Sequence, residues 1–484
     1  MKRYLPTFIA LLLALLMFAS CGGNAGTDVP DTAATDADET IAETEAENLK
    51  DNLGAYDFGG EEFTFYSRLQ ATPNFHGALF AAEETGEILN DTILRRNRTI
   101  EERFNYVMTE VLGTTTDAAR TAVLAGDDTY KVISTRCSYA FDYACEGLLY
   151  PVTDLPEIDL DRAYWDAKLT SDMTVLHKMY FAVGTFNLTS YDFTHVLLFN
   201  KKMAEDYNIG NLYGIVSDGQ WTFDRFGEIA GSITADTDGS GTMDAEDTYG
   251  FVSAGKQVPP CFWISGGVLS VSKNADDIPV FEMKENSRFL TVLERVYNIT
   301  WDNNAWMYTS SDENVPTVVR DQFRNGKALF LDCTCFHIED FRAMETDFGI
   351  IPFPKYDEAQ DEYCSRIEGC ELFCVPVTNN KLEMTSVILE AMASESAQYL
   401  LPVYYDVILT SKYTRDSESA EMLDIIYGNR IFDYGDTIWC DLLRDKVLKD
   451  MYKANNRDFA SKVESLTATV QDRIDKTVEA FKAL

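Results

Sequence analysis

The sequence is poor in histidine and in positive charge. Only four histidines occur among 484 residues, and 41 Lys and Arg stand against 79 Asp and Glu, which gives a net charge near −38. So few histidines leave little material for a multi-histidine metal site or a histidine-based relay. An acidic surface neutralises neither nucleic-acid phosphates nor anionic lipid head groups. We therefore expect no nucleic-acid partner and no electrostatic docking to a membrane.

Recognisable catalytic motifs are also missing. The sequence contains no Gly-x-Ser-x-Gly elbow, no His-Glu-x-x-His helix and no phosphate-binding loop. Paired carboxylates of a glycoside hydrolase cannot be picked out from 79 acids, because their separation is a property of the fold. We expect a protein that is not an enzyme. A surface-anchored glycan-processing enzyme remains the alternative.

Long hydrophobic runs are absent except near the start of the chain. Lys2 and Arg3 precede the apolar run Phe8–Phe18, which as a helix rises only about 16 Å, against a bilayer core of about 30 Å. These features predict a secretory signal peptide over residues 1–20. The pair Ala19-Ser20 before Cys21 resembles the lipobox of bacterial lipoproteins. That resemblance implies lipidation of Cys21 and a lipid anchor at the extracellular face of the cell membrane. An ordinary signal peptide followed by a chance cysteine is the alternative.

The segment after Cys21 has almost no large apolar side chains. Gly22–Asn52 contains nine acids and a single base, Lys50. Such a composition cannot offset the entropy cost of ordering the chain. Residues 21–55 are therefore predicted to be an acidic, disordered tether.

Nine cysteines remain when Cys21 is set aside, an odd number that leaves at least one free thiol in an exported chain. They are Cys137, Cys145, Cys261, Cys333, Cys335, Cys364, Cys370, Cys374 and Cys440. No Cys-x-x-Cys pair occurs, and the spacing of Cys333 and Cys335 is not that of a zinc ribbon. Buried thiols are favoured over a metal cluster. One or two disulfides are compatible with the sequence, which does not assign them.

Short apolar runs alternate with helical patterns from residue 56 onward. Strands are expected at 62–66, 130–134, 180–183, 195–199, 328–331, 348–351 and 372–375, and helices at 89–104, 117–125, 223–233, 384–393 and 463–481. This order predicts an α/β fold with mostly parallel sheets. About 430 residues exceed one core, so two lobes are expected. We place residues 56–185 and 370–410 in lobe 1, and 186–369 and 411–484 in lobe 2.

One local motif has the spacing of a calcium-binding loop. Over residues 236–247, oxygen donors recur at EF-hand positions and Gly241 stands where that loop turns sharply. The candidate ligands are Asp236, Asp238, Ser240, the carbonyl of Thr242, Asp244 and Asp247. Asp247 replaces the bidentate glutamate of an EF-hand, so a weaker site is expected. A bound Ca²⁺ would be structural, because a saturated ion leaves no place for a substrate. An acidic turn without a metal is the alternative.

Several stretches resemble the family-1, sugar-binding type of extracellular solute-binding proteins of ABC transporters, and in particular clostridial lipoproteins. They are Glu87–Asn105, Phe199–Met203, Gln220–Asp224, Asp247–Phe251, Gly326–Phe330 and Phe348–Lys355. The resemblance implies a type II periplasmic-binding-protein-like fold, with hinge strands crossing between two lobes and a ligand cleft between them. It also implies a monomer that captures a small solute, with an oligosaccharide expected, and delivers it to membrane permease subunits. A receptor that binds solute for a sensor is the alternative.

In open α/β sheets the ligand lies beyond the carboxyl ends of the strands. This rule and the resemblance select candidate residues whose side chains can stack on a sugar or hydrogen-bond its hydroxyls. The candidates are Ser67, Arg68, Arg136, Tyr139, Trp165, Phe262, Trp263, Asp332, Thr334 and Phe336. The last three lie in a segment where sugar-binding relatives often place a tryptophan, which this sequence lacks there.

Overall fold

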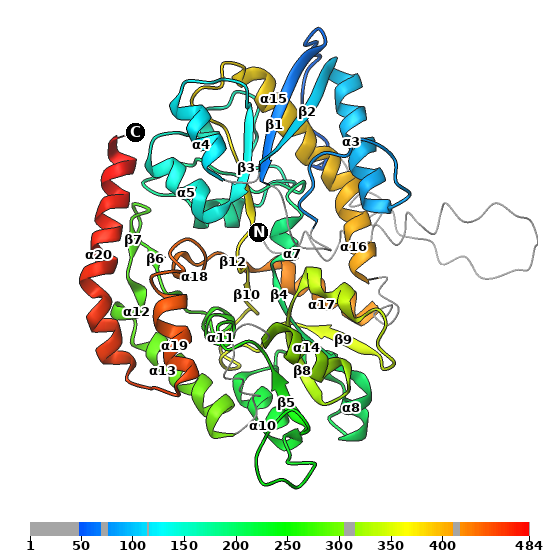
Figure 1. The fold of residues 1–484 in the computed structure, drawn as a ribbon, viewed down its shortest axis with the longest axis vertical. Helices are drawn as coiled ribbons and strands as arrows, with labels where there is room; N and C mark the ends of the chain where they lie inside the picture. Colours follow the sequence, from blue (N-terminus) through cyan, green and yellow to red (C-terminus); the bar gives the residue numbers. More distant parts are fainter. Residues whose placement is uncertain (1–47, 69–75, 114–115, 304–314, 410–416, 484) are drawn as a thin grey trace, which may run out of the picture.

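The computed structural model describes residues 48–68, 76–113, 116–303, 315–409 and 417–483, and it is organised around two four-stranded sheets (Figure 1). The predicted signal peptide, Cys21 and residues 21–47 of the predicted tether lie outside the described residues. No helix in the described part is long and apolar enough to cross a membrane.

The first sheet is built mainly from the N-terminal part of the chain. Its strands are β1 (Glu61–Arg68), β2 (Tyr106–Gly113), β3 (Val132–Arg136) and β11 (Glu371–Cys374), in the order β11-β3-β1-β2. β1 runs parallel to β2 and β3, whereas β11 joins β3 antiparallel. The five consecutive buried residues of β1, Phe63–Ser67, show that this strand is covered on both faces.

The second sheet has a different pattern of directions. Its strands are β4 (His195–Asn200), β5 (Tyr249–Val252), β8 (Ala328–Thr334) and β9 (Phe348–Ile351), in the order β5-β8-β4-β9. β4 is antiparallel to both of its neighbours, and only β5 and β8 are parallel. The prediction of mostly parallel sheets is therefore wrong for this sheet. The chain enters this sheet through β4, which therefore runs away from the first lobe. The other three strands run in the opposite direction, back toward the first lobe.

The five helices expected from the sequence are present, as α3, α4, α10, α15 and α20. The expected helix at 223–233 is α10 (Phe223–Ile233), and the Thr222 hydroxyl accepts a hydrogen bond from the Arg225 N–H as its N-cap. The remaining helices and turns, in chain order, are α3 (Ile88–Phe104), α4 (Thr116–Leu124), α5 (Cys137–Cys145), η1 (Val152–Asp154), α6 (Ala167–Asp172), α7 (Thr189–Asp192), α8 (Lys201–Asp206), α9 (Leu212–Ser217), α11 (Val258–Ser265), α12 (Glu282–Glu285), α13 (Ser287–Tyr297), η2 (Asn298–Asp302), α14 (Val315–Arg324), η3 (Cys335–Phe341), α15 (Leu382–Glu395), η4 (Ser396–Leu400), α16 (Leu401–Leu409), α17 (Ser417–Gly428), α18 (Tyr434–Thr437), η5 (Arg444–Leu448), α19 (Lys449–Lys453) and α20 (Phe459–Ala483). Short strand pairs are β6 (Ser272–Lys273) with β7 (Pro279–Val280), and β10 (Ser365–Arg366) with β12 (Arg430–Ile431).

The predicted strand at 180–183 is not part of either sheet. It contributes one isolated bridge, between Ala182 and Phe373 of β11. The strand β2 was not expected, and its edge position leaves Val107, Val111 and Leu112 exposed, so the buried alternation that marks a strand is weak.

The end of the predicted tether is folded. The Asp51 N–H donates to the Ser394 hydroxyl at 3.0 Å, and Arg103 pairs with the Asp51 carboxylate at 2.7 Å. Leu49 and Leu53 pack against the apolar cluster beneath the first sheet. The prediction of disorder up to residue 55 is therefore wrong for residues 48–55, which lie on α3 and α15.

The C-terminal helix α20 packs on both lobes. Its N-terminal end packs Phe459 against Tyr297 of α13, and its C-terminal end packs Phe481 against Phe141 of α5 and Tyr180. Figure 1 shows this helix running along one side of the molecule from the second sheet's half to the first's. Its assignment to lobe 2 alone is thus corrected: α20 spans both.

Candidate functional site

In both sheets, the carboxyl ends of the parallel strands lie next to the segments that connect the two lobes. In the first sheet, Glu371 at the start of β11 pairs with Arg136 at the end of β3, and β1 runs parallel to β3. In the second, His195 at the start of β4 pairs with Thr334 at the end of β8, and β5 runs parallel to β8. The carboxyl ends of β1, β3, β5 and β8 therefore all lie at the crossing between the lobes.

Among the described segments that connect the lobes, the two around Thr194 and Ile367 are hydrogen-bonded to each other. Thr194 forms an antiparallel bridge with Ile367, and the Glu368 N–H donates to the Phe193 carbonyl at 3.0 Å. Toward the first sheet, the Asn187 side-chain amide donates to the Glu371 carbonyl at 2.5 Å. The crossing is thus a paired ribbon around which the candidate polar side chains gather.

On the first-sheet side, the strand ends carry positive and hydroxyl groups. Arg68 at the end of β1 pairs with the Glu371 carboxylate at 2.5 Å and stays 20 % exposed, whereas the Glu371 side chain is 3 % exposed. Arg136 is exposed at the start of α5, and Tyr139 is 41 % exposed one turn later. Ser67 is buried beside Arg68. The predicted residues Ser67, Arg68, Arg136 and Tyr139 therefore share one edge of the sheet.

On the second-sheet side, the loop after β5 meets the crossing ribbon. The Gln257 side-chain amide donates to the Glu368 carboxylate at 2.9 Å, and Lys256 lies 3.8 Å from the same carboxylate. Lys256 and Glu368 are both partly exposed, at 43 % and 21 %. Burial alone would raise the pKa of Glu368, but contacts with His195, Arg366 and Lys256 hold it well below its usual range. Glu368 is therefore an ionised acceptor at the crossing.

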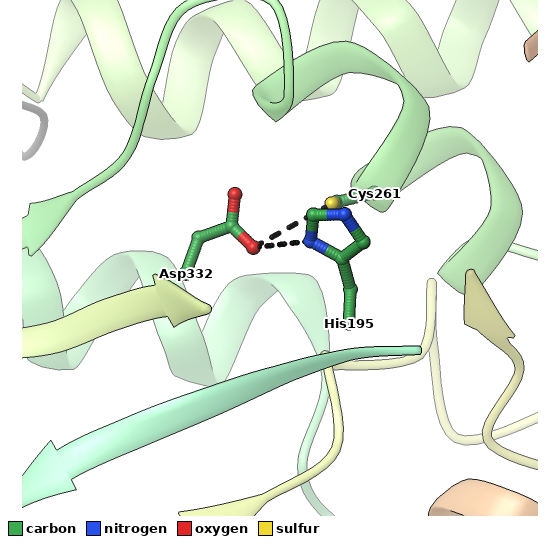
Figure 2. A group of neighbouring side chains, drawn as sticks. All are labelled: His195, Cys261 and Asp332. Carbon is green, nitrogen blue, oxygen red and sulfur yellow. Dashed lines mark hydrogen bonds and ion pairs between the residues drawn. The ribbon is translucent and has the colours of Figure 1, made fainter. Parts of the chain in front are cut away.

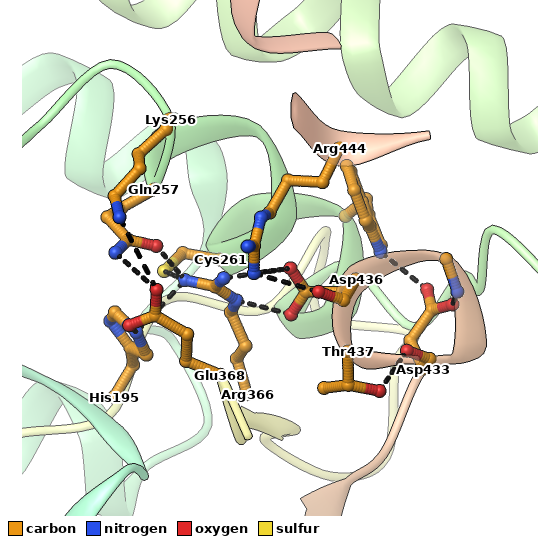
Figure 3. A network of polar contacts seen from close by, with 12 residues as sticks. His195, Lys256, Gln257, Cys261, Arg366, Glu368, Asp433, Asp436, Thr437 and Arg444 are labelled. Carbon is orange, nitrogen blue, oxygen red and sulfur yellow. Dashed lines mark hydrogen bonds and ion pairs between the residues drawn. The ribbon is translucent and has the colours of Figure 1, made fainter. Parts of the chain in front are cut away.

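A buried arginine, Arg366, lies at the centre of a network of polar contacts beside the crossing ribbon (Figure 3). Arg366 forms a bidentate pair with Asp436, Nε to Oδ2 at 2.6 Å and Nη2 to Oδ1 at 2.8 Å, and both side chains are 1 % exposed or less. Its Nη1 donates to the Gln257 side-chain oxygen, and Arg444 donates to the Asp436 carbonyl at 2.8 Å. The charges are paired in a dry environment, so the network fixes Gln257 and the crossing ribbon relative to each other.

His195, Cys261 and Asp332 form a cluster whose residue types can bind a transition metal (Figure 2). His195 Nδ1 lies 2.7 Å from the Asp332 carboxylate, and the Cys261 thiol lies 3.8 Å from that carboxylate. However, Arg366 Nη1 lies 2.9 Å from His195 Nε2 and 3.6 Å from the Cys261 sulfur. A guanidinium already lies against two of the three metal-ligating groups, so we regard this cluster as part of the structural network.

Three predicted cleft aromatics belong to the core. Phe262 and Trp263 lie in α11 with no exposed surface, and the Trp263 indole donates to Asp433 at 2.8 Å. Trp165 is 5 % exposed and its indole donates to Glu390 at 2.9 Å. Their assignment as solute-stacking residues is therefore wrong in this structure, because each side chain is almost completely buried.

The segment Asp332–Phe336 is also less open than predicted. Strand β8 continues to Thr334, so Asp332 and Thr334 lie in the strand rather than in a loop after it. Asp332 accepts from Ser253 at 2.7 Å and lies 2.7 Å from His195 Nδ1, and Thr334 is 7 % exposed. Phe336 packs edge-on against Phe193 of the crossing, with ring centroids 5.4 Å apart. Phe336 therefore packs on the ribbon, whereas the Asp332 carboxylate is held by Ser253 and His195.

Sequence reasoning missed Lys256, Gln257, Glu368 and Glu371. The first two follow β5, which would have been found by treating Tyr249–Val252 as a strand and applying the same rule of carboxyl ends. Glu368 precedes β11 and Glu371 is its first residue, and both lie at the site because β11 is antiparallel. No local signal marks that reversal of direction.

The predicted calcium loop has a preorganised backbone. Carboxylate oxygens of Asp236, Asp238 and Asp247 lie within 4.8 Å of one another. Asp236 accepts from the Gly239 and Gly241 N–H groups at 2.7 Å, and Gly241 has φ +81°, a conformation that favours glycine. The backbone hydrogen bond from Asp244 holds the pKa of Asp247 below its usual value. The loop therefore holds the carboxylates of Asp236, Asp238 and Asp247 close together.

Two cavities lie in the second lobe, away from the crossing. One, of about 440 Å³, is lined by α10, α13 and η2, including Asp224 and Arg295. The other, of about 460 Å³, lies between β4, α8 and α9, beside Lys201. Neither is lined by a predicted ligand residue, so the candidate site rests on the convergence of strand ends.

Known structures share this architecture, although no protein-family model and no curated protein matches the sequence. An ABC substrate-binding protein from Listeria monocytogenes in complex with cycloalternan is 13 % identical, with a TM-score of 0.53 over 87 % of this chain and 99 % of that one. The maltose-binding periplasmic protein of the same organism is 12 % identical, with a TM-score of 0.57 over 86 % and 98 %. MalX from Streptococcus pneumoniae, in complex with maltopentaose, is 14 % identical, with a TM-score of 0.53 over 84 % and 100 %.

The chain has the two-lobed fold of periplasmic-binding proteins. The predicted fold class is thereby confirmed, including the α/β lobes and the crossing strands between them. At such low identity the likeness establishes the fold and leaves the ligand to be inferred from this chain's own residues.

Proposed function

We propose that this protein is an extracellular solute-binding component of an ABC importer, which captures an oligosaccharide between its lobes and passes it to membrane permease subunits. The observation that carries the proposal is that the carboxyl ends of β1, β3, β5 and β8 meet at one crossing, where partly exposed polar side chains gather. The structural neighbours named above, which include complexes with cycloalternan and maltopentaose, support the choice of sugar.

The chemistry of the crossing suits a polyhydroxylated solute. Arg68, Arg136 and Lys256 offer hydrogen-bond donors, the ionised Glu368 offers acceptors, and the exposed ring of Tyr139 offers an apolar face. Two lobes connected by a few crossing segments can rotate relative to each other as rigid bodies. A solute that contacts both lobes binds the closed form more tightly and shifts the population toward it.

Isothermal titration calorimetry with maltotetraose, maltopentaose and cycloalternan tests the proposal. We expect saturable one-to-one binding of at least one of these sugars, with the sugar recovered intact by mass spectrometry. Arg136→Met should weaken that binding by at least tenfold, about 1.4 kcal/mol, without changing the melting temperature, because the side chain is exposed. Hydrolysed sugar would instead favour the glycan-processing enzyme.

We also propose that lipid on Cys21 anchors the protein to the outer face of the cell membrane, with residues 22–47 as a tether. The lipobox-like residues before Cys21 and the acidic composition after it support this. Expression of the full-length chain in a lipoprotein-processing bacterium is expected to give a membrane-bound product, and Cys21→Ser is expected to give a released one. An equal distribution of the two forms would contradict the anchor.

The loop over residues 236–247 is proposed to bind a structural Ca²⁺, through Asp236, Asp238, Ser240, Thr242, Asp244 and Asp247. Because only the folded loop gathers these oxygens, calcium at a hundredfold excess over its Kd should stabilise the protein by about 2.7 kcal/mol. Differential scanning fluorimetry with calcium and with EDTA measures this as a higher melting temperature.

The matched variants are Asp236→Asn with Asp238→Asn, which should abolish the calcium effect, and the exposed Asp361→Asn, which should keep it. A melting temperature that calcium leaves unchanged in the parent protein would contradict the loop's assignment.

A further inference from the structure

Two cysteines face each other where the crossing ribbon joins the first sheet. In the antiparallel ladder of β3 and β11, Glu371 pairs with Arg136, so Cys370 and Cys137 are the next directly opposed residues. The Cys137 N–H donates to the Cys370 carbonyl at 3.0 Å, so one hydrogen bond joins the two residues where β3 ends and α5 begins. Opposed residues of a hydrogen-bonded antiparallel pair have Cα atoms about 5.5 Å apart. That spacing lies at the commonest value for disulfides, about 5.5–6 Å.

In this structure both residues are free thiols, and both are buried. Both belong to one buried apolar cluster, together with Leu372, at exposures of 5 % for Cys137 and 4 % for Cys370. A Cβ placed on Gly369 would lie 3.7 Å from the Cys137 sulfur, so this thiol leans toward the ribbon. Opposed side chains on one face of a strand pair have Cβ atoms about 4.5–5.5 Å apart, so a rotation about each Cα–Cβ bond brings the sulfurs toward each other.

We propose that Cys137 and Cys370 form a disulfide that fixes the crossing ribbon to the first lobe. In the step, the thiolate of one cysteine attacks a small external disulfide such as oxidised glutathione and releases one glutathione thiolate. The other cysteine then attacks the protein sulfur of the mixed disulfide and displaces the second glutathione thiolate. The protein loses two protons and two electrons, and the oxidant leaves as two reduced thiols. The remaining cysteines of the described chain stay as thiols.

Other partners for these thiols fit less well. Cys374 lies four residues along β11 from Cys370, a rise of about 13 Å, and it is opposed to Ile133. Cys440 is near enough to affect the titration of Cys137, but no backbone ladder holds the two side by side. Because Cys137 and Cys370 are both buried, the bond is expected to form while the chain folds in an oxidising compartment.

This disulfide would make the crossing ribbon more rigid. Cys370 follows Gly369, and Gly369 follows the candidate ligand Glu368, so the bond would tie the ribbon to the first turn of α5 beside Arg136. The first-lobe end of the hinge would then move with that lobe, and rotation would be confined to residues on the second-lobe side of Gly369.

Peptide mapping of the mature chain, exported to an oxidising bacterial periplasm and alkylated before digestion, tests this. Trypsin places Cys137 in the peptide 137–162, Cys370 in 367–381 and Cys440 in 431–444. We expect 137–162 linked to 367–381, with Cys440 alkylated. Reduction should lower the melting temperature by several degrees.

Variants separate the four possible links between those two peptides, since Cys145 and Cys374 also lie in them. The link should vanish in Cys137→Ser and Cys370→Ser and persist in Cys145→Ser and Cys374→Ser. Alkylation of both Cys137 and Cys370 in the parent protein, or a link from 137–162 to 431–444, would overturn the proposal even if a variant failed to fold.

Discussion

Replacing Arg366 with methionine is expected to lower the free energy of unfolding by about 3–5 kcal/mol. The substitution keeps an unbranched side chain but removes the charge that pairs with Asp436, whose side chain has no exposed surface. Asp436 would keep only Arg444, which lies 3.3 Å from its carboxylate. An unpaired carboxylate in a dry site is costly, whichever side chain fills the space. Urea denaturation followed by fluorescence measures the loss.

Arg457→Met is the matched control. Arg457 also pairs with an aspartate through two nitrogens, but it is 34 % exposed and its partner Asp302 is 51 % exposed. Water screens such a pair, so its loss should cost less than about 1 kcal/mol. Equal effects of the two variants would show that the burial of Arg366 has no energetic consequence, and would contradict the role given to the network.

Replacing Asp424 with asparagine is expected to stabilise the protein at pH 8 by roughly 2–4 kcal/mol. Asp424 lies on α17 and is 8 % exposed, and one carboxylate oxygen has no hydrogen-bond partner. Burial, followed by the charge of Glu421, raises its pKa to about 7. The folded state therefore binds a proton more tightly than the unfolded chain. Stability should fall as the pH rises from about 4 to 7, and the full penalty should be present above 7.

Asparagine carries no charge at any pH, so the gain of Asp424→Asn should shrink as the pH falls from 8 to 5. Asp361→Asn removes a carboxylate from an exposed position and should change stability little at either pH. Denaturation curves of the three proteins at both pH values provide the comparison. A gain that is the same at pH 5 and pH 8 would mean that the charge of Asp424 is not its cause.

Much of the fold could be predicted from the sequence because its elements have strong local signals. The apolar spacing of Leu89, Ile93, Ile100 and Phe104 marks α3, and Thr222 marks the start of α10. What could not be predicted is the direction of strands. β4 and β11 look like any buried strand, and only the tertiary connection makes each of them antiparallel.

Part of the candidate site could be predicted from the rule that ligands bind at the carboxyl ends of strands. The remaining residues depend on strand direction and side-chain packing, which the sequence does not show. The carboxyl-end rule selected Ser67, Arg68 and Arg136, which do lie at one edge. It missed Glu371 because this residue begins an antiparallel strand, whose amino end lies at the crossing. Trp263 was selected for its indole ring. It is buried, however, by side chains that are distant in the sequence, such as Phe289 of α13 and Asp433, the N-cap of α18.

The central claim is that two lobes close on a solute bound at their crossing. Small-angle X-ray scattering of the mature protein, with and without a saturating sugar identified by calorimetry, tests it most directly. The account predicts a smaller radius of gyration with the sugar, and no such change for Arg136→Met at the same sugar concentration. An identical radius of gyration in the presence of bound sugar would contradict it.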